Sequence, residues 1–303
     1  MSAPPLRVGP EVAAAIAEQQ PVVALESTIF SSLGLSAPVN RATFDDCVAA
    51  VRAEGAVPAL CAVLDGVAHV GLDDATPVFE LTTKLGERDL PIAIARGGSG
   101  VTTVSATLAL AARAGIAVFA TGGIGGVHRD AATSGDISAD LPAIARHPVV
   151  TVSAGVKGFL DVARTVEYLE TAGVPVLGWQ TDEFPAFWCR TSGARVAARV
   201  EDAASVAAAV AAARALGNPT GVLVVAPCPH GAAIAADEID PVIEAALGAA
   251  AAAGVRGGAV TPHLLEHIAV STGGRALQAN RALAVHNAQI AAAIAGSLVE
   301  ASL

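Results

Sequence analysis

The chain alternates short apolar runs with longer alanine-rich segments. The runs are rich in Val and Ile and carry no polar face, which is typical of strands buried on both sides of a sheet. They cover residues 22–25, 57–64, 92–95, 116–120, 149–152, 174–178 and 222–226. Helices are predicted between them, near residues 41–54, 104–114, 160–171 and 203–216. This order predicts an α/β fold with a largely parallel central sheet flanked by helices, an α/β/α sandwich.

The last quarter of the chain has a different pattern. From Pro241 onward it is mainly helical, with segments at residues 238–253, 262–271 and 277–298 that could wrap the sheet or mediate assembly. No linker-like tract and no internal repeat separates this part from the rest. We therefore expect a single domain spanning residues 1–303.

Composition narrows the class of protein. The chain is 53% hydrophobic and 15% charged, which suffices for a substantial core. A net charge of −10 disfavours a nucleic-acid surface, so we expect any bound phosphate to be small and held in a local pocket. The longest apolar stretches fall short of the roughly 18 residues of a membrane span, and the first residues lack a signal-peptide pattern. We expect a cytoplasmic protein that binds metabolites, and neither nucleic acid nor a membrane.

Lysine is nearly absent from this chain. Of 18 basic residues, 16 are Arg, and the two lysines are Lys84 and Lys157. A guanidinium stays protonated, whereas a lysine amine can lose its proton and act as a nucleophile. The two lysines therefore indicate two sites that need an amine, although composition alone also allows two exposed lysines retained by chance.

Polar residues gather just after the predicted strands. In open α/β sheets, ligands bind beyond the carboxyl ends of the strands. Glu26 follows the first run, and Lys157 follows a later one within a glycine-containing loop. Glycine-rich segments at residues 96–100 and 121–129 follow two others. Lys157 thus occupies a position where an active site is expected.

The first glycine-rich loop, with the Thr102 and Thr103 hydroxyls after it, could hold a phosphate at a helix start. An ordinary tight turn is the alternative. Neither loop completes the G-x-G-x-x-G fingerprint, because Thr103 and His128 stand where the last glycine would be. A nucleotide-cofactor site is therefore not indicated.

Asp136 and Asp140 precede another predicted helix. Either carboxylate could cap that helix, and this is the reading that the sequence favours. The alternative is a divalent cation such as Mn²⁺ or Mg²⁺ held by one carboxylate, water and substrate oxygens.

Two further patterns resemble known sites, but each is weak evidence for one. His263 and His267 match the H-x-x-E-H pattern of a metalloprotease, yet Thr261 and Pro262 suggest a helix start that places His263 in the first turn. Cys228 lies near a histidine, which is slight support for a reactive thiolate.

Several long motifs together resemble the pseudouridine-5'-phosphate glycosidase family, which includes the indigoidine synthase A-like proteins. They are VALESTI at 23–29, GVTTV at 100–104, FATGGIGGVHR at 119–129, DISADL at 136–141 and AGVK at 154–157. The match continues at residues 167–171, 185–191 and 272–274, and so covers nearly the whole chain in order.

The resemblance implies roles at the matching positions. Lys157 would be the nucleophile, Glu26 the proton donor and Asp136 the ligand of a catalytic Mn²⁺. The implied substrate contacts are Lys84, Thr103, Val104, Ser138, Ala139 and Asp140, with His128 and Asn280 as binders of the sugar phosphate. The family is typically a cytoplasmic homotrimer that converts pseudouridine 5'-phosphate and water reversibly into uracil and ribose 5-phosphate.

This reaction explains the need for an amine. An ordinary glycosidase protonates a leaving oxygen or nitrogen, whereas here the leaving atom is carbon. Departure becomes feasible if the ribose opens and C1' is held as an imine to Lys157, while an acid supplies the proton needed at C5 of uracil.

The chain departs from the family at the rim of the expected site. Residues 30–40 lack a histidine found there in most members and are one residue longer, and Ala226 replaces a common asparagine. Two alternatives therefore stay open: a Schiff-base lyase or aldolase for another phosphosugar, and a phosphosugar-binding protein without turnover.

Overall fold

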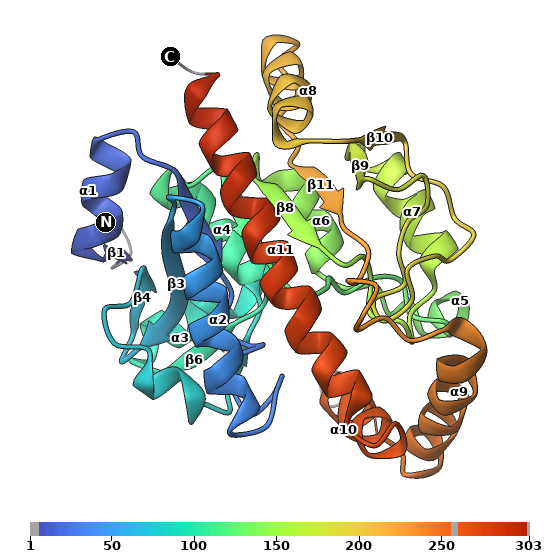
Figure 1. Cartoon of the computed structure of the whole chain (residues 1–303). Helices are drawn as coiled ribbons and strands as arrows, with labels where there is room; N and C mark the ends of the chain where they lie inside the picture. The colour runs from blue at the N-terminus through green and yellow to red at the C-terminus, as the bar shows by residue number, and fades with distance from the viewer. Residues whose placement is uncertain (1–5, 256–259, 302–303) are drawn as a thin grey trace.

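A computed structural model describes residues 6–255 and 260–301 (Figure 1). A mostly parallel sheet crosses the molecule in the strand order β1-β4-β3-β2-β7-β8-β11-β9-β10, and off this path β6 pairs with β3 and β5 pairs with β6. The strands are β1 (Leu6–Val8), β2 (Val22–Leu25), β3 (Val57–Leu64), β4 (Val67–Val70), β5 (Lys84–Leu85), β6 (Gly100–Thr102), β7 (Val118–Ala120), β8 (Val150–Ser153), β9 (Val176–Trp179), β10 (Ala198–Val200) and β11 (Val222–Val225).

Helices cover both faces of this sheet. On one face, α11 packs on β2, β7 and β8 between α2 and α8, and on the other α4 packs on β7 and α6 on β11. This arrangement confirms the predicted α/β/α sandwich. The helices are α1 (Pro10–Ala17), α2 (Val39–Ala53), α3 (Leu90–Ala95), α4 (Val104–Ala114), α5 (Ala131–Ser134), α6 (Asp140–Arg146), α7 (Val162–Thr171), α8 (Ala203–Ala215), α9 (Ala236–Ala252), α10 (Val260–Ser271) and α11 (Arg275–Glu300).

The long strand β3 belongs to two parts of the sheet. Its first four residues pair in parallel with β2, and its last four pair antiparallel with β4. Strand β6 also pairs antiparallel with this second half, so the end of β6 meets the end of β2. There the Thr102 amide donates to the Ser27 hydroxyl over 2.8 Å, and the Thr28 amide donates to the Thr102 carbonyl over 3.1 Å.

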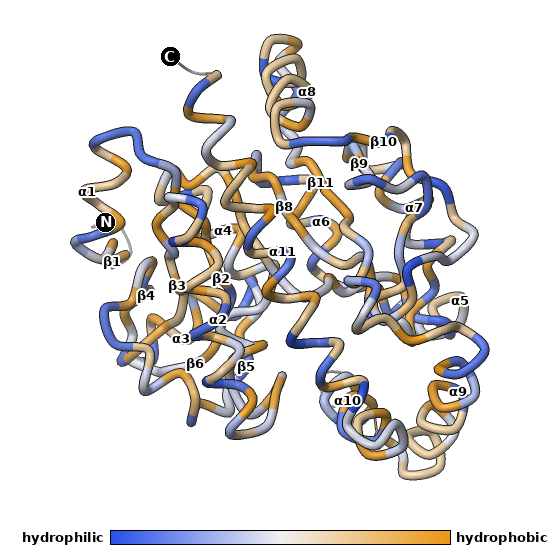
Figure 2. Tube along the Cα trace, in the orientation of Figure 1, coloured by the Kyte–Doolittle hydropathy of each residue, from blue (hydrophilic) through white to orange (hydrophobic). Residues whose placement is uncertain are grey.

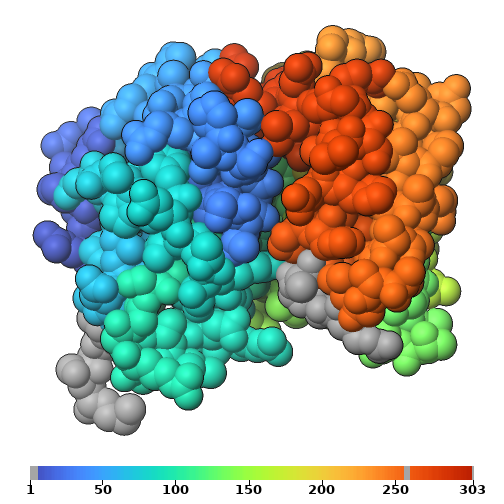
Figure 3. All heavy atoms as spheres, turned by 90° about the horizontal axis from the view of Figure 1, so that it is seen from below, coloured from blue at the N-terminus to red at the C-terminus, as the bar shows by residue number. Residues whose placement is uncertain are grey.

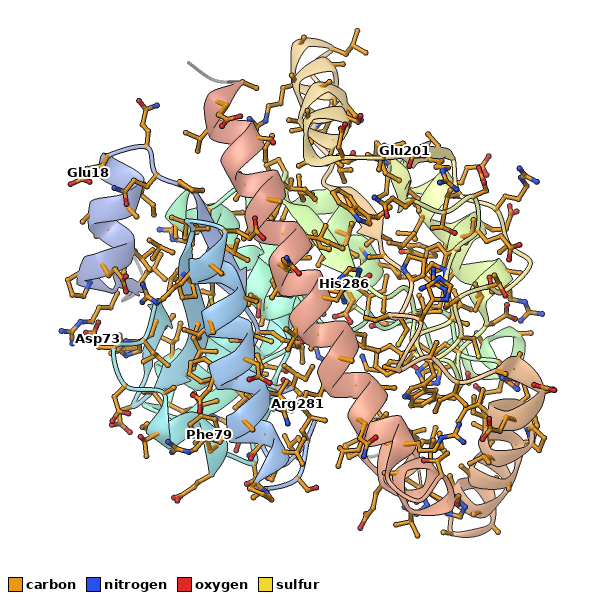
Figure 4. The ribbon with its side chains drawn as sticks, viewed as in Figure 1. Glu18, Asp73, Phe79, Glu201, Arg281 and His286 are labelled. Carbon is orange, nitrogen blue, oxygen red and sulfur yellow. The ribbon has the colours of Figure 1, made fainter. Side chains whose placement is uncertain are left out.

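The C-terminal helix α11 is long and apolar enough to cross a membrane by length and composition alone. In the structure, 56% of its most apolar window is buried, and it runs diagonally over the sheet. Figure 2 shows hydrophobic residues along the strands beneath it. Arg281 points from α11 toward α2, where its guanidinium pairs with Asp46 over 2.6 Å (Figure 4). The apolar character of α11 therefore fits a helix that packs on the core.

One predicted strand is wrong. Residues 92–95 belong to helix α3, which has a proline in its first turn. Ile92 is 52% exposed, so this run is not buried on both faces as the strand prediction required. Four apolar residues carry too little periodicity to separate a strand from a helix, and Pro91 suits a helix start. The loop at residues 96–99 accordingly joins a helix to the short strand β6.

Helix α10 begins earlier than Thr261 and Pro262 suggest. Val260 is already helical, so Pro262 lies inside the first turn, and residues 256–259 lie outside the described part of the chain. The other predicted helices and strands agree with the structure within a few residues.

Candidate active site

Three adjacent parallel strands bring polar residues together at their carboxyl ends. Glu26 directly follows β2, Thr121 follows β7, and Lys157 comes four residues after β8. Seen from the side where these strands end, the surface is hollowed between the blue N-terminal segments and the red helices α10 and α11 (Figure 3). Lys157 and Glu26, predicted from distant parts of the sequence, therefore share one site.

The loops after β7 and β8 continue the pairing of the two strands. The Ile124 amide donates to the Gly155 carbonyl over 3.0 Å, and the Lys157 amide donates to the Ile124 carbonyl over 3.2 Å. Gly155 has φ +79°, and a Cβ atom there would lie 2.0 Å from the Pro185 carbonyl oxygen. Only glycine fits this turn, which fixes the direction in which Lys157 leaves the sheet.

The Lys157 side chain is half-buried. Its Nζ donates a hydrogen bond to the Gly123 carbonyl over 3.0 Å. Burial lowers the pKa of Lys157, Asp140 and Glu26 raise it, and Lys84 lowers it, for a net decrease. A lowered pKa increases the fraction of neutral amine, the form that can attack an electrophilic carbon.

The Glu26 carboxyl is 7% exposed. The Thr121 hydroxyl donates a hydrogen bond to Oε1 of Glu26. Burial raises the pKa of Glu26 to about 7, against the opposing effects of Lys157, Thr121 and Lys84. A carboxyl with a pKa near 7 can both donate and accept a proton at neutral pH.

Asp140 is buried beside this pair and has a different role from the predicted cap. Its two carboxylate oxygens accept hydrogen bonds from the Ser105 amide over 3.1 Å and the Gly125 amide over 2.8 Å. Ser105 is in the first turn of α4, so Asp140 occupies the amino end of α4 and not that of its own helix α6. The predicted capping of α6 by Asp136 or Asp140 is therefore wrong.

Three predicted substrate contacts surround the start of α4. Lys84 is exposed on the short strand β5, and its charge acts on both Glu26 and Lys157. Thr103 precedes α4, with its hydroxyl 3.0 Å from the Ser105 hydroxyl, and Val104 is buried. Asp140 already accepts a hydrogen bond from the Ser105 amide. The start of α4 therefore has fewer free N–H groups for a phosphate than the sequence suggested.

Four more predicted ligands lie between β7 and α6, namely His128, Asp136, Ser138 and Ala139. Asp136 is 45% exposed, and Oδ2 of its carboxylate lies 3.8 Å from Nε2 of His128. Ser138 accepts a hydrogen bond from the Asp140 amide over 3.2 Å, and Ala139 is exposed. Among the described residues no group of three His, Cys, Asp or Glu side chains could hold a metal. Asp136 therefore fits an ion that keeps most of its water and takes one protein carboxylate.

Asn280 lies on the buried side of α11. Its Oδ1 accepts a hydrogen bond from Nε1 of Trp188 over 2.7 Å. This bond uses the side-chain oxygen of Asn280, and its NH₂ group is the part that could donate to a phosphate. Binding of a sugar phosphate by Asn280 stays a prediction.

Neither of the two weak patterns forms a site. In the described parts of the chain, His263 and His267 have no third metal ligand near them. Burial raises the pKa of the Cys228 thiol to about 12, so Cys228 is not a thiolate.

Sequence reasoning missed two residues that touch this site. Thr121 was grouped with the glycine loop, and Asn287 of α11 was passed over within an alanine-rich helix. The Asn287 side chain donates to the Thr121 and Gly122 carbonyls over 2.8 and 3.2 Å. An asparagine at a core-facing position of a mainly apolar helix is a sequence signal that could have indicated Asn287.

Comparison with known proteins gives full-length matches. Residues 11–297 match the model of the family described as "Indigoidine synthase A like protein". The chain is 49% identical to a pseudouridine-5'-phosphate glycosidase of Paracoccus denitrificans, over 97% of this chain and 99% of that protein. It is also 49% identical to one of a Nocardioides species, over 96% of each.

Two solved structures share the whole architecture. The prealnumycin C-glycosynthase AlnA in complex with ribulose 5-phosphate superposes with a TM-score of 0.90 at 38% identity, covering 99% of both chains. An indigoidine synthase A-like protein of Thermotoga maritima superposes with a TM-score of 0.87 at 34% identity, covering 97% of both.

Proposed function

Since this chain belongs to the indigoidine synthase A-like family, we propose that it reversibly cleaves the carbon-carbon glycosidic bond of pseudouridine 5'-phosphate. The products are uracil and ribose 5-phosphate. The observation that carries this proposal is the half-buried Lys157 amine, with its lowered pKa, beside the buried acid Glu26. The glycosidase names of the relatives support the same substrate.

Lys157 supplies the nucleophile. Its neutral Nζ bonds to C1' as the bond from C1' to the ring oxygen breaks, and the proton lost by nitrogen is taken up by that oxygen. The nitrogen lone pair then forms an iminium as the bond from C1' to uracil C5 breaks. Water hydrolyses the iminium, which frees ribose 5-phosphate and the lysine amine.

Glu26 supplies the proton that the carbon leaving group needs. Its carboxylic acid protonates C5 of uracil as the bond to C1' breaks, and it regains a proton from the hydrolysis step. The pKa of about 7 keeps a substantial fraction of Glu26 protonated at neutral pH. Without this proton the leaving group would be a carbanion.

Asp136 would hold a Mn²⁺ ion, with His128 close by. When bound, the ion would supply positive charge that binds and orients substrate oxygens. The exposed carboxylate and the neighbouring imidazole suit this metal, whose usual ligands include oxygen donors and water. Ser138 and Ala139 on the same loop would line the substrate.

The test is an assay for uracil release from pseudouridine 5'-phosphate with Mn²⁺ present, run also in reverse from uracil and ribose 5-phosphate. We expect turnover in both directions and a loss of at least about 10³-fold in Lys157→Arg, which keeps the charge but has no nucleophilic amine. Arg146→Lys, on the exposed side of α6, is the matched control and should keep wild-type activity. No uracil release by the wild-type protein would refute the proposal.

One observation favours a second candidate. The solved C-glycosynthase with a similar fold was crystallised with ribulose 5-phosphate, a different phosphosugar. In this chain, residues 30–38 form turns between β2 and α2, beside Glu26, and they differ from the family pattern. A Schiff-base lyase or C-glycosidase for another phosphosugar is therefore the alternative. Borohydride trapping of Lys157 with ribulose 5-phosphate, without uracil release from pseudouridine 5'-phosphate, would favour it.

A further inference from the structure

Within residues 6–255 and 260–301, the buried carboxyl of Glu26 has one hydrogen-bond donor from a side chain. The Thr121 hydroxyl donates to its Oε1. The charged groups that act on Glu26 are Lys157 on the loop after β8, Asp140 at the start of α6 and Lys84 on β5. Thr121 is a neutral group beside these charges, and its hydroxyl favours the carboxylate over the acid because it donates a hydrogen bond to it.

Asn287 holds the backbone from which the Thr121 hydroxyl projects. It lies on α11, which packs on β7, and it is fully buried. Its Nδ2 donates to the carbonyls of Thr121 and Gly122 over 2.8 and 3.2 Å. Its Oδ1 is buried without a hydrogen-bond partner in the described structure.

The unpaired Oδ1 of Asn287 carries a desolvation cost that an alanine at the same place would not, while the two hydrogen bonds from Nδ2 act in the opposite direction. Three neighbours of Asn287 on α11 are the buried alanines Ala284, Ala288 and Ala291, whose side chains have no polar atoms. The contacts that Asn287 makes go to the loop that carries Thr121.

We propose that Thr121 and Asn287 are positioning residues for the acid of the site. Asn287 fixes the backbone after β7, and Thr121 thereby holds Oε1 of Glu26 in one orientation and sets the pH at which Glu26 gains its proton. The inference deepens the proposed function, on which it rests for the role of Glu26. Neither residue touches the reacting bond.

The experiment compares Thr121→Val, which keeps the shape and removes the hydroxyl, with Thr121→Ser, which keeps the hydroxyl. Thr43→Val is the matched control, because Thr43 is a fully buried threonine on α2 whose hydroxyl donates to the Val39 carbonyl. In Thr121→Val we expect kcat to fall about 10-fold and the basic limb of the pH profile of kcat/KM to move about one unit higher. Thr121→Ser and Thr43→Val should keep the wild-type profile.

Carbon-13 NMR titration of glutamate-labelled protein tests the same point without activity, with Glu26→Gln to assign the signal. The Glu26 carboxyl should titrate at higher pH in Thr121→Val than in wild type. This measurement stays informative if the wild-type protein releases no uracil, which would refute the proposed function alone. An unchanged Glu26 titration in Thr121→Val would overturn the positioning role.

Asn287→Leu tests the second step. If Asn287 acts through Thr121, its loss should move the Glu26 titration in the same direction, and the double variant should titrate like Thr121→Val alone. Additive shifts would instead mean that Asn287 acts on Glu26 by another route. A lower melting temperature with a wild-type Glu26 titration would reduce Asn287 to a packing residue and overturn its part of the proposal.

Discussion

At the scale of single residues, the site balances two groups that burial drives toward their neutral forms. Burial raises the pKa of Glu26 and lowers that of Lys157. Two flanking charges act on both groups in the same direction, because Asp140 raises both pKa values and Lys84 lowers both. Asp140 and Lys84 therefore set how many protons the site holds at a given pH.

Removing the charge of Asp140 should move the pH optimum of the enzyme to lower values. In Asp140→Asn, both Lys157 and Glu26 lose the carboxylate that favours their protonated forms. The rising limb of kcat/KM, from Lys157, and the falling limb, from Glu26, should both shift by about half a unit or more. Asp202→Asn, which alters the N-cap of the distant helix α8, should leave the optimum unchanged. An unmoved optimum in Asp140→Asn would contradict this account.

At the scale of elements, the position of Lys157 depends on the turn after β8. In Gly155→Ala the new Cβ atom meets the Pro185 carbonyl oxygen at 2.0 Å, and φ is positive. We expect a loss of at least about 2 kcal/mol in the free energy of unfolding, because strain and a backbone clash add together.

Gly193→Ala is the control for this prediction. Gly193 has φ +80°, but a Cβ atom there would meet no atom within 4 Å. Its cost should be about 1 kcal/mol, the conformational part alone. Urea unfolding of both variants gives the comparison, and equal losses would show that the contact with Pro185 does not matter.

Elements differ in how far the sequence determines them. The apolar runs that became β2, β3 and β11 were predicted as strands, and each is largely buried in the sheet. The run at residues 92–95 was not, because the partial exposure of α3 arises from tertiary packing. The short strands β5 and β6 have too few residues for any periodicity, so the place of Lys84 on β5 needed the structure.

The residues of the candidate site also differ in how far the sequence predicts them. The positions of Lys157 and Glu26, the proposed nucleophile and acid, were predictable from their places after strands and from motif resemblance. The role of Asp140 was not, because its partner amides at Ser105 and Gly125 lie 35 and 15 residues away along the chain. Thr121 and Asn287 meet across 166 residues, a contact that no local pattern encodes.

At the scale of the whole molecule, α11 connects the N-terminal half of the sheet to the active site. Arg281 pairs with Asp46 of α2 at one point, and Asn287 holds the β7 loop two turns further on. The helix therefore stabilises the fold and the catalytic loop together, and its apolar composition serves this packing.

The buried Glu26 should also make the stability of the whole protein depend on pH. Its pKa is raised from 4.5 to about 7 in the folded state, so the folded protein binds more protons than the unfolded chain between these values. Stability from this group is present below pH 4.5 and is lost as pH rises through 7. Glu26→Gln stays neutral at every pH. Between pH 4.5 and 7 its free energy of unfolding should therefore rise relative to that of wild type, by up to about 3 kcal/mol.

Urea unfolding of wild type and Glu26→Gln at several values between pH 4.5 and 8 measures this difference. Lys157→Met should move the window to higher pH, because the cation that lowers the Glu26 pKa is then gone. A constant difference between wild type and Glu26→Gln across the range would mean that the carboxyl keeps an ordinary pKa. In that case Glu26 would be ionised at neutral pH and would hold no proton for the leaving carbon, so the stability measurement also tests the chemistry assigned to this residue.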